Sequence, residues 1–168
     1  MKGVGLMRRM AVVAILAVCC GVFGIGAAWG GPEPEQEVAA VLDALHDAAS
    51  QANGQTYFAL FSENAVFFGT DKAERWPIDE FQPYGQKRFD TGTGWTYKPV
   101  ERHVYFSADG KTAWFDERLD HKASEARGTG VLVQVGDEWK IVQYNLSFPV
   151  PNELFDGVYS IVKAYEEK

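Results

Sequence analysis

The pattern of apolar and polar positions after residue 33 predicts helices first and strands afterwards. Over residues 35–51, apolar side chains recur every three or four positions, as they do on one face of an amphipathic helix. Asn53-Gly54 is expected to end this helix, and Pro77 is placed to begin another, which Pro83 should distort. Helices are predicted over residues 35–51, 55–61, 78–86 and 154–165.

Strands are predicted where apolar and polar residues alternate between turn-forming residues. They cover residues 65–69, 98–107, 111–122, 126–135 and 138–148. Helices followed by a run of strands favour an α+β domain, with the N-terminal helices packed on a strongly curved antiparallel sheet that forms a cone with an internal pocket. We expect the last two strands to line the concave side of this cone.

Strand alternation also predicts which side chains face the interior. In the strand over residues 111–122, the apolar face contains Phe115, Leu119 and one carboxylate, Glu117. Burial would raise the pKa of Glu117 and suit it to general acid or base chemistry. Alternatively, Glu117 forms a structural ion pair with a buried base such as Arg127.

The last strand places three polar side chains in a row. By strand alternation, Gln143, Asn145 and Ser147 share a face with Trp139 and Ile141, so an apolar floor leads to groups that could orient a ligand. The alternative is a solvated strand end. The opposite face is also apolar, which predicts that one face packs under the helices and the other meets a second subunit.

The segment after the first strand contains Asp71, Glu74 and Trp76, which either close the mouth of the pocket or form a charged loop. With Tyr84 from the third helix, the predicted ligand-binding set is complete: Trp76, Tyr84, Glu117, Arg127, Gln143, Asn145 and Ser147. His103 is more typical of a structural histidine. His46 and His121 lack metal-ligand spacing with it, so no metal or other cofactor is expected.

The N-terminus has the order of a secretory signal: Lys2, Arg8 and Arg9, then an apolar run over residues 10–29, then small and turn-forming residues. We divide the chain into a signal peptide or membrane anchor (1–30), a linker (31–36), a cone domain (37–151) and a C-terminal helix (152–168). The folded part is expected outside the cytoplasm, periplasmic or extracellular. The alternative is an uncleaved anchor formed by residues 10–29.

Charge and cysteine content exclude several function classes. The formal net charge is −7, and every acidic residue follows the leader, so the folded part repels phosphate backbones and nucleic acid is not an expected partner. A neutral or cationic small molecule is easier to admit. Cys19 and Cys20 both lie in the leader, so the folded domain has no disulfide and no cysteine metal site.

Two segments carry a family resemblance: residues 57–71, YFALFSENAVFFGTD, and residues 127–147, which begin RGTGVLV and end WKIVQYNLS. Together with the order of elements, they resemble the SnoaL-like branch of the nuclear transport factor 2-like superfamily over most of residues 37–151. The resemblance implies a cone with an internal pocket and frequent homodimers through the sheet. Members include isomerases, dehydratases, polyketide cyclases and non-catalytic binding modules, so the fold does not choose among them.

The resemblance does not transfer catalytic roles. Relatives often carry histidines on the last strand where this chain has Gln143 and Asn145, and an amide does not exchange protons near neutral pH. The paired carboxylate and tyrosine of ketosteroid isomerase-like members have no matching positions. The sequence therefore favours binding of a small, largely apolar molecule by an exported homodimer. An isomerase, dehydratase or cyclase using Glu117, and a non-catalytic dimerisation module, stay open as alternatives.

Overall fold

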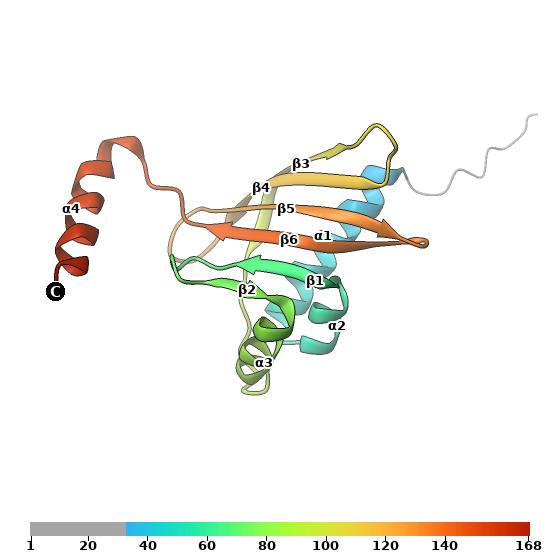
Figure 1. Cartoon of the computed structure of the whole chain (residues 1–168), viewed down its shortest axis with the longest axis horizontal. Helices are drawn as coiled ribbons and strands as arrows, with labels where there is room; N and C mark the ends of the chain where they lie inside the picture. Colours follow the sequence, from blue (N-terminus) through green and yellow to red (C-terminus); the bar gives the residue numbers. More distant parts are fainter. Residues whose placement is uncertain (1–32) are drawn as a thin grey trace, which may run out of the picture. The chain divides into compact units, whose positions relative to one another are not determined.

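The computed structural model describes residues 33–168, in which helices cover one face of a six-stranded sheet (Figure 1). In chain order the elements are α1 (Pro34–Ser50), α2 (Gly54–Ala59), β1 (Phe61–Phe68), β2 (Arg75–Pro77), α3 (Ile78–Phe89), β3 (Lys98–Phe106), β4 (Thr112–Asp120), β5 (Ala126–Val135), β6 (Glu138–Ser147), the 3-10 helix η1 (Asn152–Leu154) and α4 (Phe155–Glu166). The predicted leader lies outside the described residues. None of the helices from α1 onward is both long and apolar enough to span a bilayer.

The predicted α+β class is confirmed, and the sheet is curled and open. Its strand order is β2-β1-β6-β5-β4-β3. The predicted antiparallel sheet is confirmed for all neighbouring pairs except β1 and β6, which run parallel. Alternation reports which face a side chain takes and carries no information on the direction of the next strand. The strand β2 was not predicted, because its three residues are too few to show an alternating pattern.

The core lies between the helices and the inner face of the sheet. α1 buries one stripe of side chains, including Val38, Leu42 and Leu45. The sheet supplies Leu132 and Ile141, which are fully buried. Each such aliphatic side chain contributes about 1.5–3 kcal/mol on transfer from water. Burial of these side chains therefore stabilises the packing of α1 against the sheet.

The alternation of buried and exposed side chains along β6 shifts by one residue near the middle of the strand. Leu132 of β5 pairs with Ile141, but the preceding Val131 pairs with Gln143, so Val142 is an extra residue in the ladder. Such a bulge shifts the alternation by one position. Trp139 and Ile141 are buried before it, and Tyr144 and Leu146 are buried after it.

This bulge corrects the predicted orientation of the polar row on β6. Gln143 is exposed, and Asn145 and Ser147 are half-buried on the side away from the core. The prediction assumed unbroken alternation from Trp139 onward, which the extra residue at Val142 interrupts. The inner surface of the second half of β6 is therefore formed by a phenol and an aliphatic side chain in place of amides and a hydroxyl.

Candidate ligand pocket

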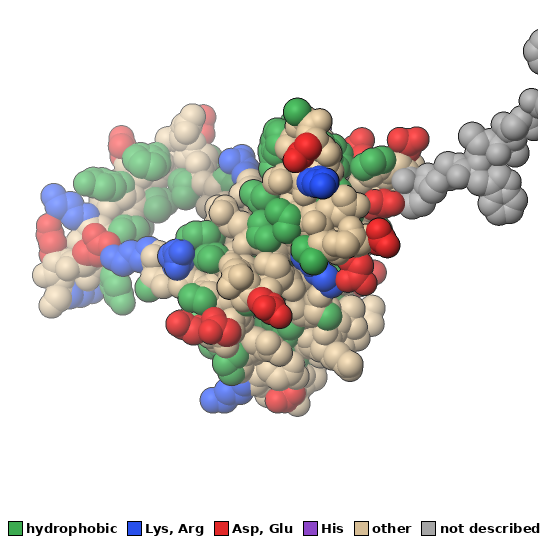
Figure 2. Space-filling view, turned by 45° about the vertical axis from the view of Figure 1, so that its right-hand side comes forward, with side chains coloured by type: hydrophobic (Ala, Val, Ile, Leu, Met, Phe, Trp, Pro, Cys, Tyr) green, Lys and Arg blue, Asp and Glu red, His purple; other side chains and the backbone are tan. Residues whose placement is uncertain are grey.

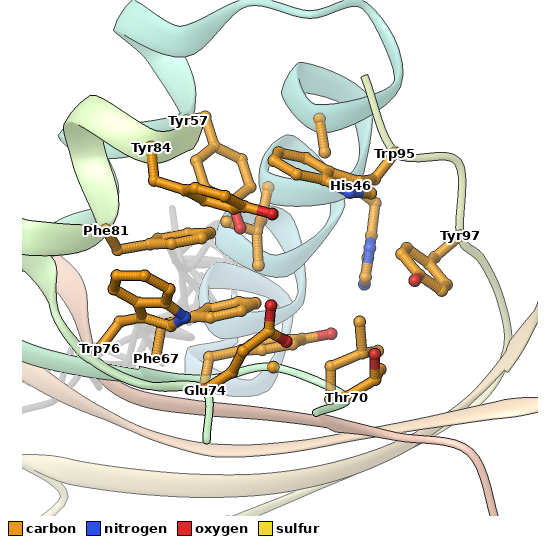
Figure 3. Close-up of a pocket in the computed structure, with 15 residues that line it drawn as sticks. His46, Tyr57, Phe67, Thr70, Glu74, Trp76, Phe81, Tyr84, Trp95 and Tyr97 are labelled. Carbon is orange, nitrogen blue, oxygen red and sulfur yellow. The ribbon is translucent and has the colours of Figure 1, made fainter. Parts of the chain in front are cut away.

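A cavity of about 240 Å³ opens between the helices and the inner face of the sheet, and aromatic rings make up most of its wall (Figure 3). Tyr57, Phe67 and Phe81 form the deep part and are buried. The Phe67 ring stacks on that of Phe81, with centroids 4.2 Å apart. Ring-lined cavities with few polar groups are typical of small-molecule sites.

Two predicted ligand-binding residues, Trp76 and Tyr84, lie at the mouth of the cavity. Trp76 follows β1 on the short strand β2, and Tyr84 comes from α3. Their rings stack at 5.3 Å with 17° between the planes, and Tyr84 is 50% exposed. The mouth thus has a flat aromatic side that solvent can reach.

Glu74 also lines the cavity, and the loop between β1 and β2 fixes its position. Its Oε2 atom accepts a hydrogen bond of 3.2 Å from the backbone N–H of Asp71. A Cβ atom at position 69 would lie 2.1 Å from the same oxygen, so Gly69 leaves the space that the carboxylate occupies. Asp71 itself is exposed and caps the loop by accepting from the N–H of Ala73 at 2.8 Å.

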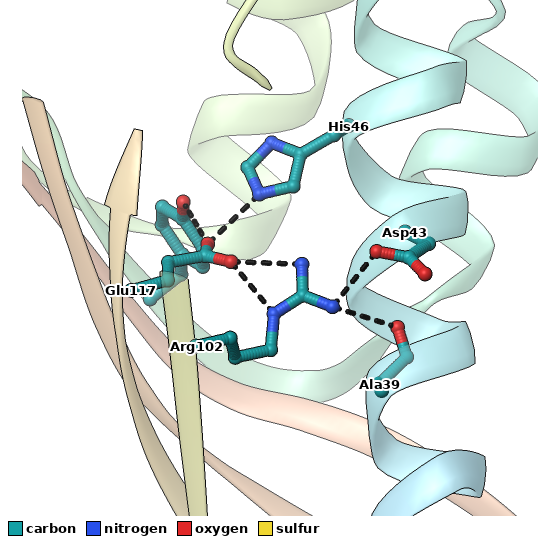
Figure 4. A network of polar contacts seen from close by, with 6 residues as sticks. Ala39, Asp43, His46, Arg102 and Glu117 are labelled. Atoms are coloured by element: carbon teal, nitrogen blue, oxygen red, sulfur yellow. Dashed lines mark hydrogen bonds and ion pairs between the residues drawn. The ribbon is translucent and has the colours of Figure 1, made fainter. Parts of the chain in front are cut away.

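At the inner end of the cavity, His46 and Tyr144 line the wall, and both contact the buried carboxylate of Glu117. Figure 4 shows the imidazole of His46 pointing toward this carboxylate. His46 Nε2 is 2.8 Å from Glu117 Oε1, and the hydroxyl of Tyr144 donates to the same oxygen at 3.1 Å. Only 1% of Glu117 is exposed, and it is not part of the cavity wall. Glu117 therefore orients two side chains that a ligand could touch.

The charge of Glu117 is compensated by Arg102. Arg102 Nε donates to Glu117 Oε2 at 2.9 Å, and the Nη1 atom donates to Asp43 at 2.7 Å and to the carbonyl of Ala39 at 3.1 Å. The inward position of Glu117 is confirmed, but the suggested partner Arg127 is wrong. In the ladder, Glu117 lies opposite Arg102, whereas Arg127 is exposed and lies opposite Arg118.

The surroundings of these groups shift their proton affinities. Burial acts to raise the pKa of Glu117, but the hydrogen bond and charge of His46 and of Arg102 outweigh it, so the pKa lies below its usual value. Burial raises the pKa of Tyr144 well above its ordinary value, and the charge of Glu117 adds to this. At neutral pH the network therefore contains an ionised carboxylate and a protonated phenol.

Sequence reasoning missed His46 as a pocket residue. His46 lies one turn beyond Leu42 on α1 and is buried with Leu45 and Ala49 on the stripe that faces the sheet. Its position on an apolar helix face was visible in the sequence, but its partner on a distant strand was not.

Four members of the predicted set, Arg127, Gln143, Asn145 and Ser147, lie outside the cavity wall, and Glu117 lies behind it. His103 is on the outer face, 3.2 Å from Glu101. His121 stacks on the pocket residue Tyr97, with ring centroids 4.8 Å apart. Within residues 33–168, no group of three or more His, Cys, Asp or Glu side chains is arranged to hold a metal ion.

Comparison with known proteins places this geometry in a family. The model of the SnoaL-like domain matches residues 38–151. Comparison with curated proteins finds no match. A nuclear transport factor 2-like protein of unknown function from Pseudomonas putida has 14% identity and a TM-score of 0.59, over 73% of this chain and 93% of that one.

Two further solved structures have the same fold. An uncharacterised protein with a cystatin-like fold from Caulobacter vibrioides is 12% identical, with a TM-score of 0.60 over 75% of this chain and 96% of the other. A protein proposed to be a scytalone dehydratase, from Novosphingobium aromaticivorans, is 11% identical, with a TM-score of 0.58 over 69% and 84%. At these identities the likeness concerns the fold alone.

Proposed function

The chain belongs to the SnoaL-like domain family, and from the geometry of its cavity we propose that it binds a small, largely apolar molecule. The observation that carries this proposal is the ring-lined cavity of about 240 Å³ with two oriented polar groups, His46 and Tyr144, at its inner end. Apolar walls supply affinity, and a few fixed polar groups set the orientation of a ligand. On the basis of the leader, we further propose that binding takes place outside the cytoplasm.

The volume of the cavity restricts the proposed ligand to a compact molecule. Its volume is below the range of about 300–1,000 Å³ that is usual for drug-sized ligands. The stacked pairs Phe67–Phe81 and Trp76–Tyr84 leave flat surfaces that suit a planar or ring-containing body. An open cavity also argues against the alternative of a dimerisation module with a filled cone.

Native mass spectrometry of the protein purified from its own host tests the proposal. We expect a retained small molecule or, in its absence, mass shifts with members of a library of aromatic fragments. Trp76→Ala should weaken fragment binding at least about tenfold, because a mouth ring is lost. Tyr159→Ala is the control, because Tyr159 is a 61% exposed ring on α4 and is not part of the cavity wall. If no fragment binds, or if both variants bind equally well, the proposal is wrong.

A second candidate function is acid–base catalysis, now with His46 as the proton-exchanging group. Glu117 lies outside the cavity, whereas His46 lines it and is held by that carboxylate at 2.8 Å. A carboxylate partner fixes the tautomer and orientation of an imidazole. Such a pair suits isomerisation or dehydration of a hydrophobic carbonyl compound.

Deuterium exchange tests this candidate before the substrate is known. A panel of enolisable aromatic ketones is incubated with the protein in D₂O, and loss of the C–H signal is followed by NMR. Catalysis predicts exchange faster than in buffer, which His46→Gln should reduce by about 100-fold or more while binding is kept. Exchange at the buffer rate for ketones that bind would exclude this function for them.

We also propose a homodimer formed through the outer face of the sheet. Tyr105 and Trp114 are 46% and 45% exposed there, and their rings stack at 6.0 Å. Exposed aromatic pairs beside further apolar side chains are typical of association surfaces. The exposed Val100 and Val135 extend the apolar character of β3 and β5.

A further inference from the structure

We propose that the ligand carries a positive charge, as a protonated amine or quaternary ammonium nitrogen attached to an apolar body. The nitrogen would lie at the mouth of the cavity, between the carboxylate of Glu74 and the rings of Trp76 and Tyr84. This inference rests on the proposed binding function and adds the charge class of the ligand.

The first argument is the charge of the cavity wall. Among the lining side chains, Glu74 is the single Asp, Glu, Lys or Arg, and none of the described ion pairs includes it. The carboxylate is half-buried, so its attraction for a cation is screened less than at an open surface. An anionic ligand would meet this charge without a compensating cation in the wall.

The second argument is that nearby cations are engaged elsewhere. Lys72 contacts Glu166 on α4, and the Arg75 guanidinium lies over the ring of Phe68, 5.9 Å from its centroid. Arg88 stacks on Trp95 at 4.9 Å, but it lines a different, adjoining hollow. At the inner end of the pocket, Arg102 is bound to Glu117 and Asp43. Glu74 therefore lacks a described internal counter-ion.

The third argument is the aromatic surface beside the carboxylate. Cations are attracted to the faces of Trp and Tyr rings, most strongly where water is excluded. Figure 3 shows the Glu74 carboxylate pointing into the cavity on the side where Trp76 and Tyr84 lie. A nitrogen placed there would have a negative charge on one side and ring faces on another.

The fourth argument is that the carboxylate is held in place before a ligand arrives. The N–H of Asp71 and the space left by Gly69 fix its position, and the backbone N–H of Gly69 donates to the Glu74 carbonyl at 3.0 Å. A preorganised charge does not lose conformational freedom on binding. The loop between β1 and β2 thus serves to present one negative charge to the pocket.

Isothermal titration calorimetry with an isosteric pair tests the inference. The probes are phenyltrimethylammonium and its neutral carbon analogue tert-butylbenzene, which have nearly the same shape, with benzoate as the anion. We expect the cation to bind about tenfold or more tightly than the neutral analogue, and benzoate to bind most weakly. Raising the salt concentration should weaken binding of the cation alone.

The variant Glu74→Gln removes the charge and keeps an acceptor for the Asp71 N–H. It should abolish most of the preference for the cation and change the affinity for tert-butylbenzene by less than about twofold. Glu63→Gln is the control, because Glu63 is an exposed carboxylate on β1 outside the cavity wall. Circular dichroism and thermal unfolding verify that both variants fold.

The outcomes separate this inference from the function on which it rests. Equal affinities for the cation and its neutral analogue, or a preference that survives Glu74→Gln, would overturn the inference and leave the binding pocket standing. Failure of all three probes to bind contradicts the pocket proposal and the charge preference together. Binding of the cation that Glu74→Gln weakens and Glu63→Gln does not supports both.

Discussion

His46 Nε2 on α1 lies 2.8 Å from Glu117 Oε1 on β4, and this contact joins the helical layer to the sheet at the inner end of the pocket. Arg102 from β3 and Tyr144 from β6 reach the same carboxylate. One buried charge on β4 therefore contacts side chains from α1, β3 and β6. It also places the imidazole and the phenol against the cavity.

Removing the buried carboxylate should destabilise the fold strongly. Glu117→Ala leaves the Arg102 guanidinium without its main partner, and breaking a buried pair on one side costs about 3–5 kcal/mol. The measurement is the free energy of unfolding in urea. Glu101→Gln is the control, because Glu101 pairs with Arg118 on the exposed outer face and its loss should have little effect. Equal losses in both variants would contradict the central role of Glu117.

The pH dependence of stability should follow the lowered pKa of Glu117. A carboxyl whose pKa is lower in the folded than in the unfolded state stabilises the fold above the unfolded pKa, about 4.3. That stabilisation is lost as pH falls through the folded value. We expect the Tm difference between wild type and Glu117→Gln to be constant from pH 7 to about 5 and to shrink below it. A difference that stays constant down to pH 3 would count against the assignment.

Gly128 should be sensitive to the smallest substitution. A Cβ at this position of β5 would lie 2.6 Å from the Tyr144 hydroxyl and 2.7 Å from Glu117 Oε1. Gly128→Ala should separate these two groups and destabilise the protein by about 1–3 kcal/mol, as overpacking does. Gly157→Ala on α4 is the matched control, since its Cβ would meet nothing within 4 Å. Thermal unfolding of the two variants gives the comparison.

Disruption of the outer face should give a monomer if the proposed dimer forms through the sheet. Trp114→Lys places a charge in the centre of the exposed ring pair with Tyr105. Sedimentation velocity should then show the monomer mass for this variant, with the dimer mass for wild type. Val150→Lys is the control, an exposed apolar residue after the last strand. A wild-type monomer across micromolar concentrations would reject the dimer.

The C-terminal helix α4 is an alternative dimer interface, and a truncated chain distinguishes it from the outer face of the sheet. Every residue of α4 is exposed, and Ile161 and Tyr165 are 72% and 74% exposed. Figure 2 shows hydrophobic side chains on the surface of this helix. A chain ending at Pro151 should remain dimeric if the outer face of the sheet carries the interface. A monomer after truncation, together with a dimeric Trp114→Lys, would move the interface to α4.

The sequence predicted what depends on local periodicity. The buried stripe of α1 and the inward face of β4, including Glu117, follow from spacings of 3.6 and 2 residues. The identity of the ion-pair partner did not follow, because it depends on which strands are neighbours. β3 places Arg102 opposite Glu117, while Arg127 faces Arg118.

The sequence predicted some pocket residues and missed others, again because periodicity is local and contacts between elements are not. Trp76 was predicted from its place after the first strand, and it lines the cavity together with Tyr84, the other aromatic member of the predicted set. His46 was missed because its function depends on a contact with β4, and Tyr144 was placed on the wrong face because one extra residue shifts β6. Periodicity predicts where a helix or strand lies, but the residues that meet in the pocket depend also on bulges and on which strands are neighbours in the sheet.

The bulge at Val142 decides which side chains of the second half of β6 line the pocket. Deleting Val142 would remove the bulge and leave Tyr144 and Leu146 facing inward, because the residues on either side of the extra one would keep their partners on β5. Pairing the same residues without a bulge would instead shift the strand after Ile141 by one position and turn Gln143, Asn145 and Ser147 inward. Gain or loss of this bulge is therefore an evolutionary route from a phenol-lined wall to an amide-lined one that requires no substitution in the wall itself.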